Sequence, residues 1–233
     1  MKFLIFSYYN ELAHHGCSFY ELAKTTMPTY KEYCEKHGYD FYCKTQNFTE
    51  GRTVGWSKFE IFLENMHKYD WMFYVECDSM LMNQTIRLEN LIDDHHDIIM
   101  TKTDTPNTIE LNCGPMLVKS SEWNKKFFEH LLNKKEYYSN QMVEQAAISD
   151  EVNQNEETRK HFKIMNLRFF NSYYHEWHPN GNYQHGDFIL HLAGTSNSYR
   201  EKVFKEMKDN IIKSNDYKIS CKPFLNIGDE NIQ

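Results

Sequence analysis

Three features are scarce or absent in this sequence, and each absence excludes a class of protein. The six cysteines include no Cys-x-x-Cys pair, so we expect free thiols in a reducing compartment and no zinc site. Basic residues are not in excess, and the net charge of −7 argues against a nucleic-acid partner, which would need a basic surface. Long apolar runs are also missing. The run at residues 3–6 is too short for a signal sequence, and we expect no transmembrane segment.

The composition does provide for one substantial core. Apolar residues make up 40% of the 233 positions and aromatic residues 15%, which suffices for one domain of ordinary size. The stretch that starts at residue 214 is only weakly patterned. We therefore predict a single domain over residues 1–213 and a C-terminal tail over residues 214–233.

Strand-like and helix-like patterns alternate along the chain. Short apolar runs predict strands at residues 2–7, 39–44, 71–75, 97–101, 111–119, 162–167 and 187–192. Apolar residues at helical spacing predict helices at 19–37, 56–67, 87–92, 122–132, 142–148 and 199–212. Polar residues predict an exposed loop at 150–160 and a long loop at 171–186, a kind of segment that is often functional. The alternation indicates an α/β fold with a twisted, mostly parallel sheet and helices on both faces.

The most informative segment is the apolar run at residues 71–75, which ends in two acids, Glu76 and Asp78. Residues two apart in a strand point to the same side, and buried carboxylates are unfavourable unless they meet a cation. Mn²⁺ and Mg²⁺ take oxygen ligands and often bridge to substrate phosphates. The pair indicates either a divalent metal site at the sheet edge where α/β folds bind nucleotides, or a strand end with solvated acids.

Two other predicted strands carry residues suited to such a site. His191 ends an apolar run, and Gly194 follows three residues later. His191 is either a structural residue or a nitrogen ligand, which Mn²⁺ tolerates better than Mg²⁺, and Gly194 would let the backbone approach a diphosphate. Asn112 lies in a strand that Gly114 and Pro115 interrupt. This pattern is either a β-bulge or a polar side chain aimed into a cleft.

Glu144 and Gln145 lie at the start of the helix predicted at residues 142–148. On the surface of that helix, an acid and an amide would have no special role. At a helix start beside a binding site, the same two residues suit sugar hydroxyls or a developing positive charge. Both interpretations remain open from the residues alone.

These pieces occur in a fixed order within residues 2–195. The order is Trp56-Ser-Lys58, Tyr69-Asp-Trp71, Glu76-Cys77-Asp78 with Met82-Asn83, Asn112-Cys-Gly114, Glu144-Gln145-Ala-Ala, Phe170-Asn171-Ser-Tyr173, Gly186-Asp187-Phe188 and His191-Leu-Ala-Gly194. In this set the chain resembles glycosyltransferase family 34, the galactosyl-, xylosyl- and mannosyltransferase group, which includes small viral members and has the GT-A fold. The usual Asp-x-Asp of the family is Glu-Cys-Asp here. The membrane anchor common in Golgi members is absent, so we expect a cytoplasmic enzyme of viral or bacterial source.

The resemblance implies a metal-dependent, retaining transfer of a hexose or pentose from a UDP-sugar to a hydroxyl of a glycan acceptor. It implies Asp78 and His191 as direct ligands of Mn²⁺ or Mg²⁺, with Glu76 at the ribose or on the metal through water. The implied donor-binding residues are Ser7, Tyr8, Lys58, Glu76, Cys77, Asn112, Gly114 and Gly194. Glu144 or Gln145 would act beneath the donor sugar, as a nucleophile or by stabilising an oxocarbenium-like transition state.

Several alternatives stay open at this point. Trp177, His178 and Tyr183 form either an aromatic platform for the acceptor or ordinary packing. A first rival function is a nucleotide-sugar-binding module that has lost catalysis, with Glu76 as the lesion. A second is a metal-dependent phosphoester hydrolase, which would use acids and histidines such as those at residues 14–15 and 93–96. We expect both of those groups on the surface.

Overall fold

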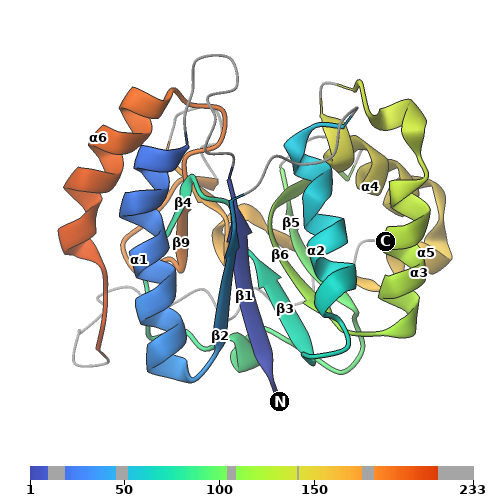
Figure 1. Ribbon diagram of the computed structural model, residues 1–233, viewed down its shortest axis with the longest axis horizontal. Coiled ribbons are helices and arrows are strands. Elements are labelled where there is room, and N and C mark those ends of the chain that lie inside the picture. The colour runs from blue at the N-terminus through green and yellow to red at the C-terminus, as the bar shows by residue number, and fades with distance from the viewer. Residues whose placement is uncertain (10–18, 46–51, 104–108, 141, 175–180, 215–233) are drawn as a thin grey trace.

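The computed structural model is built around a six-stranded sheet with the order β2-β1-β3-β6-β5-β7 (Figure 1). The structure describes residues 1–9, 19–45, 52–103, 109–140, 142–174 and 181–214. β1 pairs in parallel with β2 and β3, and β5 with β7, whereas β6 runs antiparallel to both of its neighbours. The six strands are β1 (Phe3–Tyr8), β2 (Asp40–Lys44), β3 (Trp71–Tyr74), β5 (Ile98–Lys102), β6 (Leu111–Lys119) and β7 (Phe162–Asn166). The predicted α/β fold with a mostly parallel sheet is confirmed.

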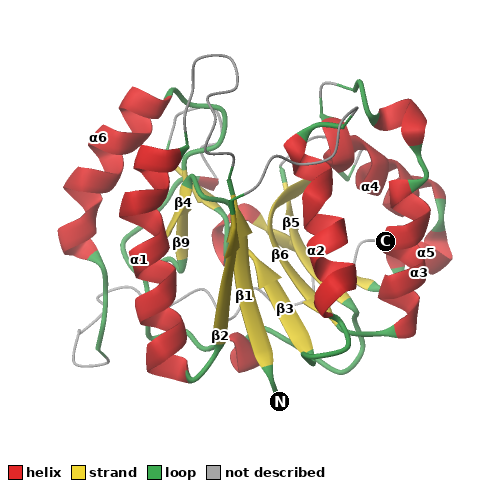
Figure 2. Cartoon of the chain, in the orientation of Figure 1, coloured by secondary structure: helices red, strands yellow, loops and turns green. Residues whose placement is uncertain are grey.

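Helices cover both faces of this sheet, as predicted (Figure 2). In Figure 1, α1 and α6 lie to the left of the sheet and α2 to α5 to its right. The helices are α1 (Tyr20–His37), α2 (Ser57–Asn65), α3 (Glu122–Leu132), α4 (Val143–Gln154), α5 (Glu156–Arg159) and α6 (Asn197–Met207). Leu4 and Phe6 join the core with α2, α3 and α4, while Phe3 and Ile5 join the core with α1. Because both faces are covered, β1 is buried along its whole length.

A smaller sheet, with the order β4-β9-β8, stands beside the main one. Its strands are β4 (Ser79–Leu81), β8 (Ser172–Tyr173) and β9 (Ile189–His191). β9 pairs with β4 through Ser79 and His191, and with β8 through Tyr173 and His191. Ser172 and Tyr173 were expected in a long loop, but this pairing makes them a strand. The small sheet brings His191 beside the acidic turn, although the two are far apart in the sequence.

The predicted exposed loop over residues 150–160 is wrong. α4 continues to Gln154, and α5 occupies Glu156–Arg159. Val152 is buried in the core, and the side chain of Asn155 accepts hydrogen bonds from two backbone N–H groups in the first turn of α5, which is a common N-cap arrangement. The polar sequence hid these helices because only a narrow face of them is buried.

β6 runs without a break through Gly114 and Pro115, so the predicted interruption of this strand is wrong. The alternative interpretation, a β-bulge, agrees with the pairing, because the register between β5 and β6 shifts between Ile99 and Thr101. A bulge is also a place where a sheet tolerates proline, which has no N–H to donate. The irregularity lies next to Asn112, a predicted site residue.

The chain stays packed up to the last residues that the structure describes. The N–H of Ile212 donates to the carbonyl oxygen of Met82 (2.7 Å), and Lys213 pairs with Glu32 (2.7 Å). The domain boundary after residue 213 stays a prediction, since residues 215–233 lie outside the described part.

Short 3-10 turns complete the fold: η1 (Val54–Trp56), η2 (Leu88–Asn90), η3 (Lys135–Tyr137), η4 (Leu167–Phe169) and η6 (Lys208–Asn210). Among the described helices, none combines the length and apolar character needed to cross a membrane.

Candidate functional site

The two predicted metal-binding acids lie in the short turn between β3 and β4. Two hydroxyl groups of α1 hold the backbone of this turn. Tyr30 Oη donates to the carbonyl oxygen of Glu76 (2.7 Å), and Thr26 Oγ1 donates to that of Cys77 (2.9 Å). The side chain of Cys77 packs into an apolar cluster with residues of β4 and β9. Of the motif Glu76-Cys77-Asp78, the two acids therefore face the site. Cys77, which was predicted to bind the donor, has its side chain in the core.

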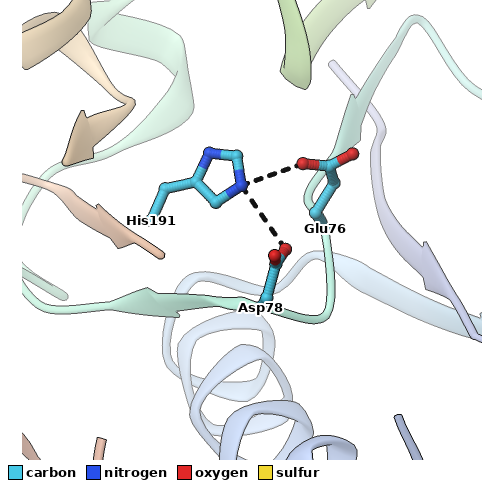
Figure 3. Close-up of side chains that lie close together, drawn as sticks. All are labelled: Glu76, Asp78 and His191. Carbon is cyan, nitrogen blue, oxygen red and sulfur yellow. Dashed lines mark ion pairs between the residues drawn. The ribbon is translucent and has the colours of Figure 1, made fainter. Parts of the chain in front are cut away.

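His191 completes a cluster with these acids (Figure 3). Its Nε2 atom lies 3.0 Å from Glu76 Oε2 and 3.4 Å from Asp78 Oδ1. The three residues each offer one ligand atom, and these atoms lie within 4.8 Å of one another. The structure thus brings together all three residues that the sequence analysis assigned to the metal.

A chain of side-chain amides fixes the orientation of the His191 ring. The N–H of Gly114 donates to Asn112 Oδ1 (2.9 Å), which also accepts from Asn171 Nδ2 (2.8 Å). Asn171 Nδ2 also donates to Thr101 Oγ1 (3.0 Å), so its Oδ1 is left to face His191 Nδ1 (2.6 Å). Because a backbone N–H can only donate, it determines the direction of every bond in this chain. His191 Nδ1 must donate, and in the neutral ring the Nε2 lone pair points at the acids.

The charges in the cluster are strongly coupled. Burial disfavours the charged imidazolium, but the carboxylates of Asp78 and Glu76 outweigh it and raise the pKa of His191 to about 9. Burial would likewise raise the pKa of Asp78, but His191 and Arg200 hold it below its usual value. Arg200 on α6 contacts Asp78 Oδ2 through Nη2 at 2.8 Å. Without another cation, His191 and Arg200 neutralise the acids.

These residues fit a divalent cation. His191 Nε2 is buried and, within the described structure, faces only the carboxylate oxygens of Glu76 and Asp78, at 3.0 and 3.4 Å. A neutral imidazole nitrogen beside two carboxylates is a donor set that suits Mn²⁺. A second such cluster of three, which a two-metal hydrolase would need, does not occur among the described residues.

Gly114 lies against the cluster and leaves no room for a side chain. A Cβ atom there would stand 2.8 Å from His191 Cε1 and 2.9 Å from both Asn112 Oδ1 and Glu76 Oε2. Glycine at position 114 therefore has a steric basis, since any larger residue would push His191, Asn112 or Glu76 aside.

A cavity of about 380 Å³ opens beside the cluster. The predicted site residues that line it are Glu76, Asn112, Gly114, Glu144, Gln145, His191 and Gly194. Sequence reasoning missed other lining residues, which include Thr103, Glu110, Met142, Val143 and Tyr173. Tyr173 accepts a hydrogen bond from Asn112 Nδ2, and it lay within a segment that carried the family resemblance. No comparable signal marked Thr103 or Glu110.

Lys58 does not line the cavity but lies beneath Glu144. Its Nζ atom is fully buried, 2.8 Å from Glu144 Oε1, and donates to the carbonyl oxygen of Cys113. Burial alone would lower the pKa of Lys58, but Glu144 holds it above the usual value. Gly55 packs against the second carboxylate oxygen of Glu144, because a Cβ atom at position 55 would stand 2.2 Å from Oε2. Glu144 is therefore a fixed, charge-balanced carboxylate.

Gln145 is oriented by the backbone of β6. Its Oε1 atom accepts from the N–H of Cys113 (3.2 Å), so the amide NH₂ group is left toward the cavity that Gln145 lines. Val143, two residues earlier, has a φ of 44°, which is strained for a β-branched residue. This unusual backbone lies at the start of α4, where both predicted catalytic residues enter the site.

The remaining predicted residues are not among those that line this cavity, or they lie outside the described residues. Ser7 is fully buried at the end of β1. Tyr8 donates to the carbonyl oxygen of Gly55 (3.1 Å) and stacks on Tyr74 with the ring centroids 5.2 Å apart. Tyr183 packs against the apolar cluster that holds Cys77. Trp177 and His178, like the histidine pair at residues 14–15, lie outside the described residues.

Matches to a known family cover most of the chain. Residues 12–109 and 90–202 match the sequence model of the galactosyl transferase GMA12/MNN10 family. An uncharacterized alpha-1,2-galactosyltransferase of Schizosaccharomyces pombe is 26% identical over 227 residues, covering 75% of this chain and 64% of the relative. An alpha-1,2-galactosyltransferase of the same yeast is 24% identical over 233 residues, covering 82% and 59%. The chain therefore spans less than two thirds of the length of either relative.

Solved glycosyltransferases share the fold. A crystal structure of a glycosyltransferase involved in glycosylation of the major capsid of PBCV-1 aligns with a TM-score of 0.68 and 16% identity, covering 88% of this chain and 100% of that one. The galactosyltransferase LgtC, in complex with donor and acceptor sugar analogs, aligns with a TM-score of 0.54 and 11% identity, covering 91% and 97%. These likenesses confirm the predicted GT-A fold.

Proposed function

The chain belongs to the galactosyl transferase GMA12/MNN10 family, and from this premise we propose that it is a metal-dependent, retaining glycosyltransferase. The donor is a UDP-sugar carrying a hexose or a pentose, and the acceptor is a hydroxyl group of a glycan. One observation carries the proposal. Glu76, Asp78 and His191 form one cluster, and two of them, Glu76 and His191, line a cavity that Glu144 and Gln145 also line.

Asp78 and His191 would hold the metal directly, and Glu76 would hold it through water or bind the ribose. The nitrogen of His191 favours Mn²⁺ over Mg²⁺. When bound, the cation supplies Lewis-acid stabilisation of the charge on the diphosphate leaving group. Asn171 and Arg200 orient His191 and Asp78 from behind, through contacts of 2.6 and 2.8 Å, and so prearrange the ligands.

The contacts favour Gln145 as the group that faces the donor sugar. Glu144 has one oxygen on Lys58 and the other against Gly55, so its carboxylate is held in place and its charge is balanced by the lysine. Gln145 presents its NH₂ group to the cavity, where it can bind a sugar hydroxyl. The side chain of Asn112 makes hydrogen bonds with Gly114, Asn171 and Tyr173, so it stabilises the wall of the cavity.

The test is thermal unfolding with UDP, GDP or CMP, each with and without Mn²⁺, followed by UDP release from a panel of UDP-sugars. A ligand at a hundred times its Kd stabilises the fold by about 2.7 kcal/mol. We expect a shift with UDP that requires Mn²⁺, and UDP release that stops when EDTA removes the metal. Asp78→Asn should lose both effects, whereas Asp94→Asn, a change at an exposed loop residue, should keep them.

Other outcomes would point to the rival functions. A Mn²⁺-dependent shift with UDP but no release from any donor would indicate a binding module. Release of phosphate from p-nitrophenyl phosphate, without a shift by any nucleotide, would indicate a hydrolase. No nucleotide shift in a well-folded sample would contradict the proposed transferase.

A further inference from the structure

Three carboxylates line the cavity, and two of them have partners within the protein. Glu76 belongs to the metal cluster, and Glu144 is paired with Lys58. Glu110 is the third. Its backbone oxygen accepts from Thr103, but none of the hydrogen bonds or ion pairs among the described residues involves its carboxylate. The cavity lining also contains no lysine or arginine among the described residues. Glu110 is therefore available to a ligand.

Glu110 lies at the end of the cavity away from the metal cluster. It precedes β6, and the Thr103 N–H donates to its carbonyl oxygen (2.9 Å), so the ladder between β5 and β6 extends one step to reach it. Gly114, which contacts the metal ligands, is four residues further along. A regular strand would place the two positions about 13 Å apart, and this is an upper limit because β6 carries three extra residues between Asn112 and Leu117. A sugar attached to a diphosphate at the metal would fit between them.

The surroundings of Glu110 suit a sugar. Glu110 and Asn112 are two residues apart in an extended segment and therefore point to the same side. Asn112 Nδ2 donates to Tyr173 Oη, so Glu110 lies on the Tyr173 side of the strand. Met142 lines the same cavity and is 45% exposed, which offers an apolar surface next to a carboxylate. A carboxylate accepts hydrogen bonds from hydroxyl groups strongly, and it repels an acidic ligand in the same space.

We propose that the end of the cavity formed by Thr103, Glu110 and Met142 is the acceptor subsite, and that Glu110 binds hydroxyl groups of a neutral acceptor sugar. This inference rests on the proposed function. It adds a substrate class: acceptors whose reacting unit carries a carboxylate or phosphate are disfavoured, because this end of the cavity offers them the carboxylate of Glu110 and the described lining contains no lysine or arginine to balance it.

The experiment compares Glu110→Gln with Glu129→Gln, a matched change at an exposed position on α3. UDP release is measured with water as the acceptor, and again with methyl α-galactoside, methyl α-mannoside, methyl β-xyloside and methyl α-galacturonide. We expect a neutral glycoside, and not the galacturonide, to accelerate release by the wild type. In Glu110→Gln the KM for that glycoside should rise about tenfold or more, because a hydrogen bond to a charged group is lost. Release with water should change far less than the KM for the glycoside, and both activities of Glu129→Gln should stay unchanged.

The two proposals fail in different ways. Wild-type protein that releases no UDP from any donor would contradict the proposed function itself. With an active wild type, three results would overturn the acceptor subsite. These are no acceleration by any neutral glycoside, an unchanged acceptor KM in Glu110→Gln, and an equal fall in release with water in that variant, which would place Glu110 at the donor.

Discussion

Asn171 sets the orientation of the His191 ring although its own side chain does not line the cavity. Its Oδ1 atom accepts from His191 Nδ1, and its NH₂ group is held by Thr101 and Asn112. Metal-binding histidines commonly depend on such a partner, and loss of the partner lowers metal affinity about 10- to 100-fold. We predict a loss of this size for Mn²⁺ in Asn171→Leu, measured by electron paramagnetic resonance of the free ion during titration.

Asn124→Leu is the matched control for that substitution. Asn124 is also fully buried, and its amide donates to the carbonyl oxygens of Asp97 (2.9 Å) and Lys119 (2.7 Å), far from the cavity. Both variants should lose stability, since each leaves buried polar groups unpaired, but only Asn171→Leu should lose Mn²⁺ affinity. Equal losses of affinity would show that general destabilisation, and not the orientation of His191, controls the site.

The residues that form the cluster were easier to single out from sequence than the residues that support them. Glu76, Asp78 and His191 each interrupt or end an apolar run, and polar residues at such places are conspicuous. Asn171 and Lys58 act through contacts between distant segments, with Asn112 and Glu144 as partners. Short-range patterns contain no information about such contacts, so the sequence pointed to these residues only through the family resemblance.

At the scale of secondary-structure elements, α1 supports the acidic turn through Tyr30. Its single hydroxyl proton is shared between the carbonyl oxygens of Glu76 and Ser79, on either side of Asp78. We predict that Tyr30→Phe lowers stability by about 1 kcal/mol and weakens Mn²⁺ binding about tenfold, because the turn that carries two ligands loses its support. Urea denaturation and Mn²⁺ titration measure the two effects separately.

Tyr33→Phe provides the comparison on the same helix. Tyr33 is equally buried, and its hydroxyl donates to the carbonyl oxygen of Ile86 (2.6 Å), which is outside the turn. This variant should lose a similar amount of stability and keep its Mn²⁺ affinity. If Tyr30→Phe also kept its full affinity, the other contacts of the turn would be sufficient to hold it, and Tyr30 would not be a support for the metal ligands.

Elements with a strong apolar period were predicted well, and elements with a weak one were not. The helix predicted at residues 122–132 has the observed bounds, because Phe127, Phe128 and Leu131 form a clear buried face. The C-terminal half of α4 buries little besides Val152, so its polar sequence resembled a loop. β8 is a strand only through its pairing with β9, and its two residues carry no pattern of their own.

At the scale of the whole molecule, the site forms where the large and small sheets meet. β3 delivers the acidic turn from the large sheet, and β9 returns His191 beside it through the small one. Alternating strands and helices were enough to predict the class of fold. The order of the strands, the antiparallel direction of β6 and the existence of the small sheet follow from pairings between distant segments, which composition and periodicity do not encode.

The opposite end of the large sheet is held by a polar clamp centred on Asp93. Its carboxylate contacts His96 Nδ1 (2.9 Å) and, across to β7, Lys163 Nζ (3.0 Å). Partial burial would raise the pKa of Asp93, but the bonds from His96, Lys163 and two backbone N–H groups hold it well below the usual value. The clamp ties the segment before β5 to β7, which lies at the edge of the sheet.

The sign of the resulting pH dependence is fixed by this lowered pKa. The folded state favours ionised Asp93, so its stabilising contribution is complete above the unfolded-state pKa of about 3.9. It is lost as the pH falls below that value toward the folded-state pKa. Asp93→Asn should therefore lower the free energy of unfolding by about 1 kcal/mol at pH 7, a modest figure because the pair is partly solvated. The difference from wild type should shrink below about pH 4.

Urea denaturation at pH 7, 5 and 3 measures this difference directly, with Asp94→Asn as the control at the adjacent exposed position. The control should follow the wild type at every pH. UDP and Mn²⁺ binding should be unchanged in both variants at pH 7, because the clamp lies outside the cavity lining. If the difference in the free energy of unfolding between Asp93→Asn and wild type stayed constant from pH 7 to pH 3, the ionisation of Asp93 would make no contribution. The clamp would then depend on packing and not on charge.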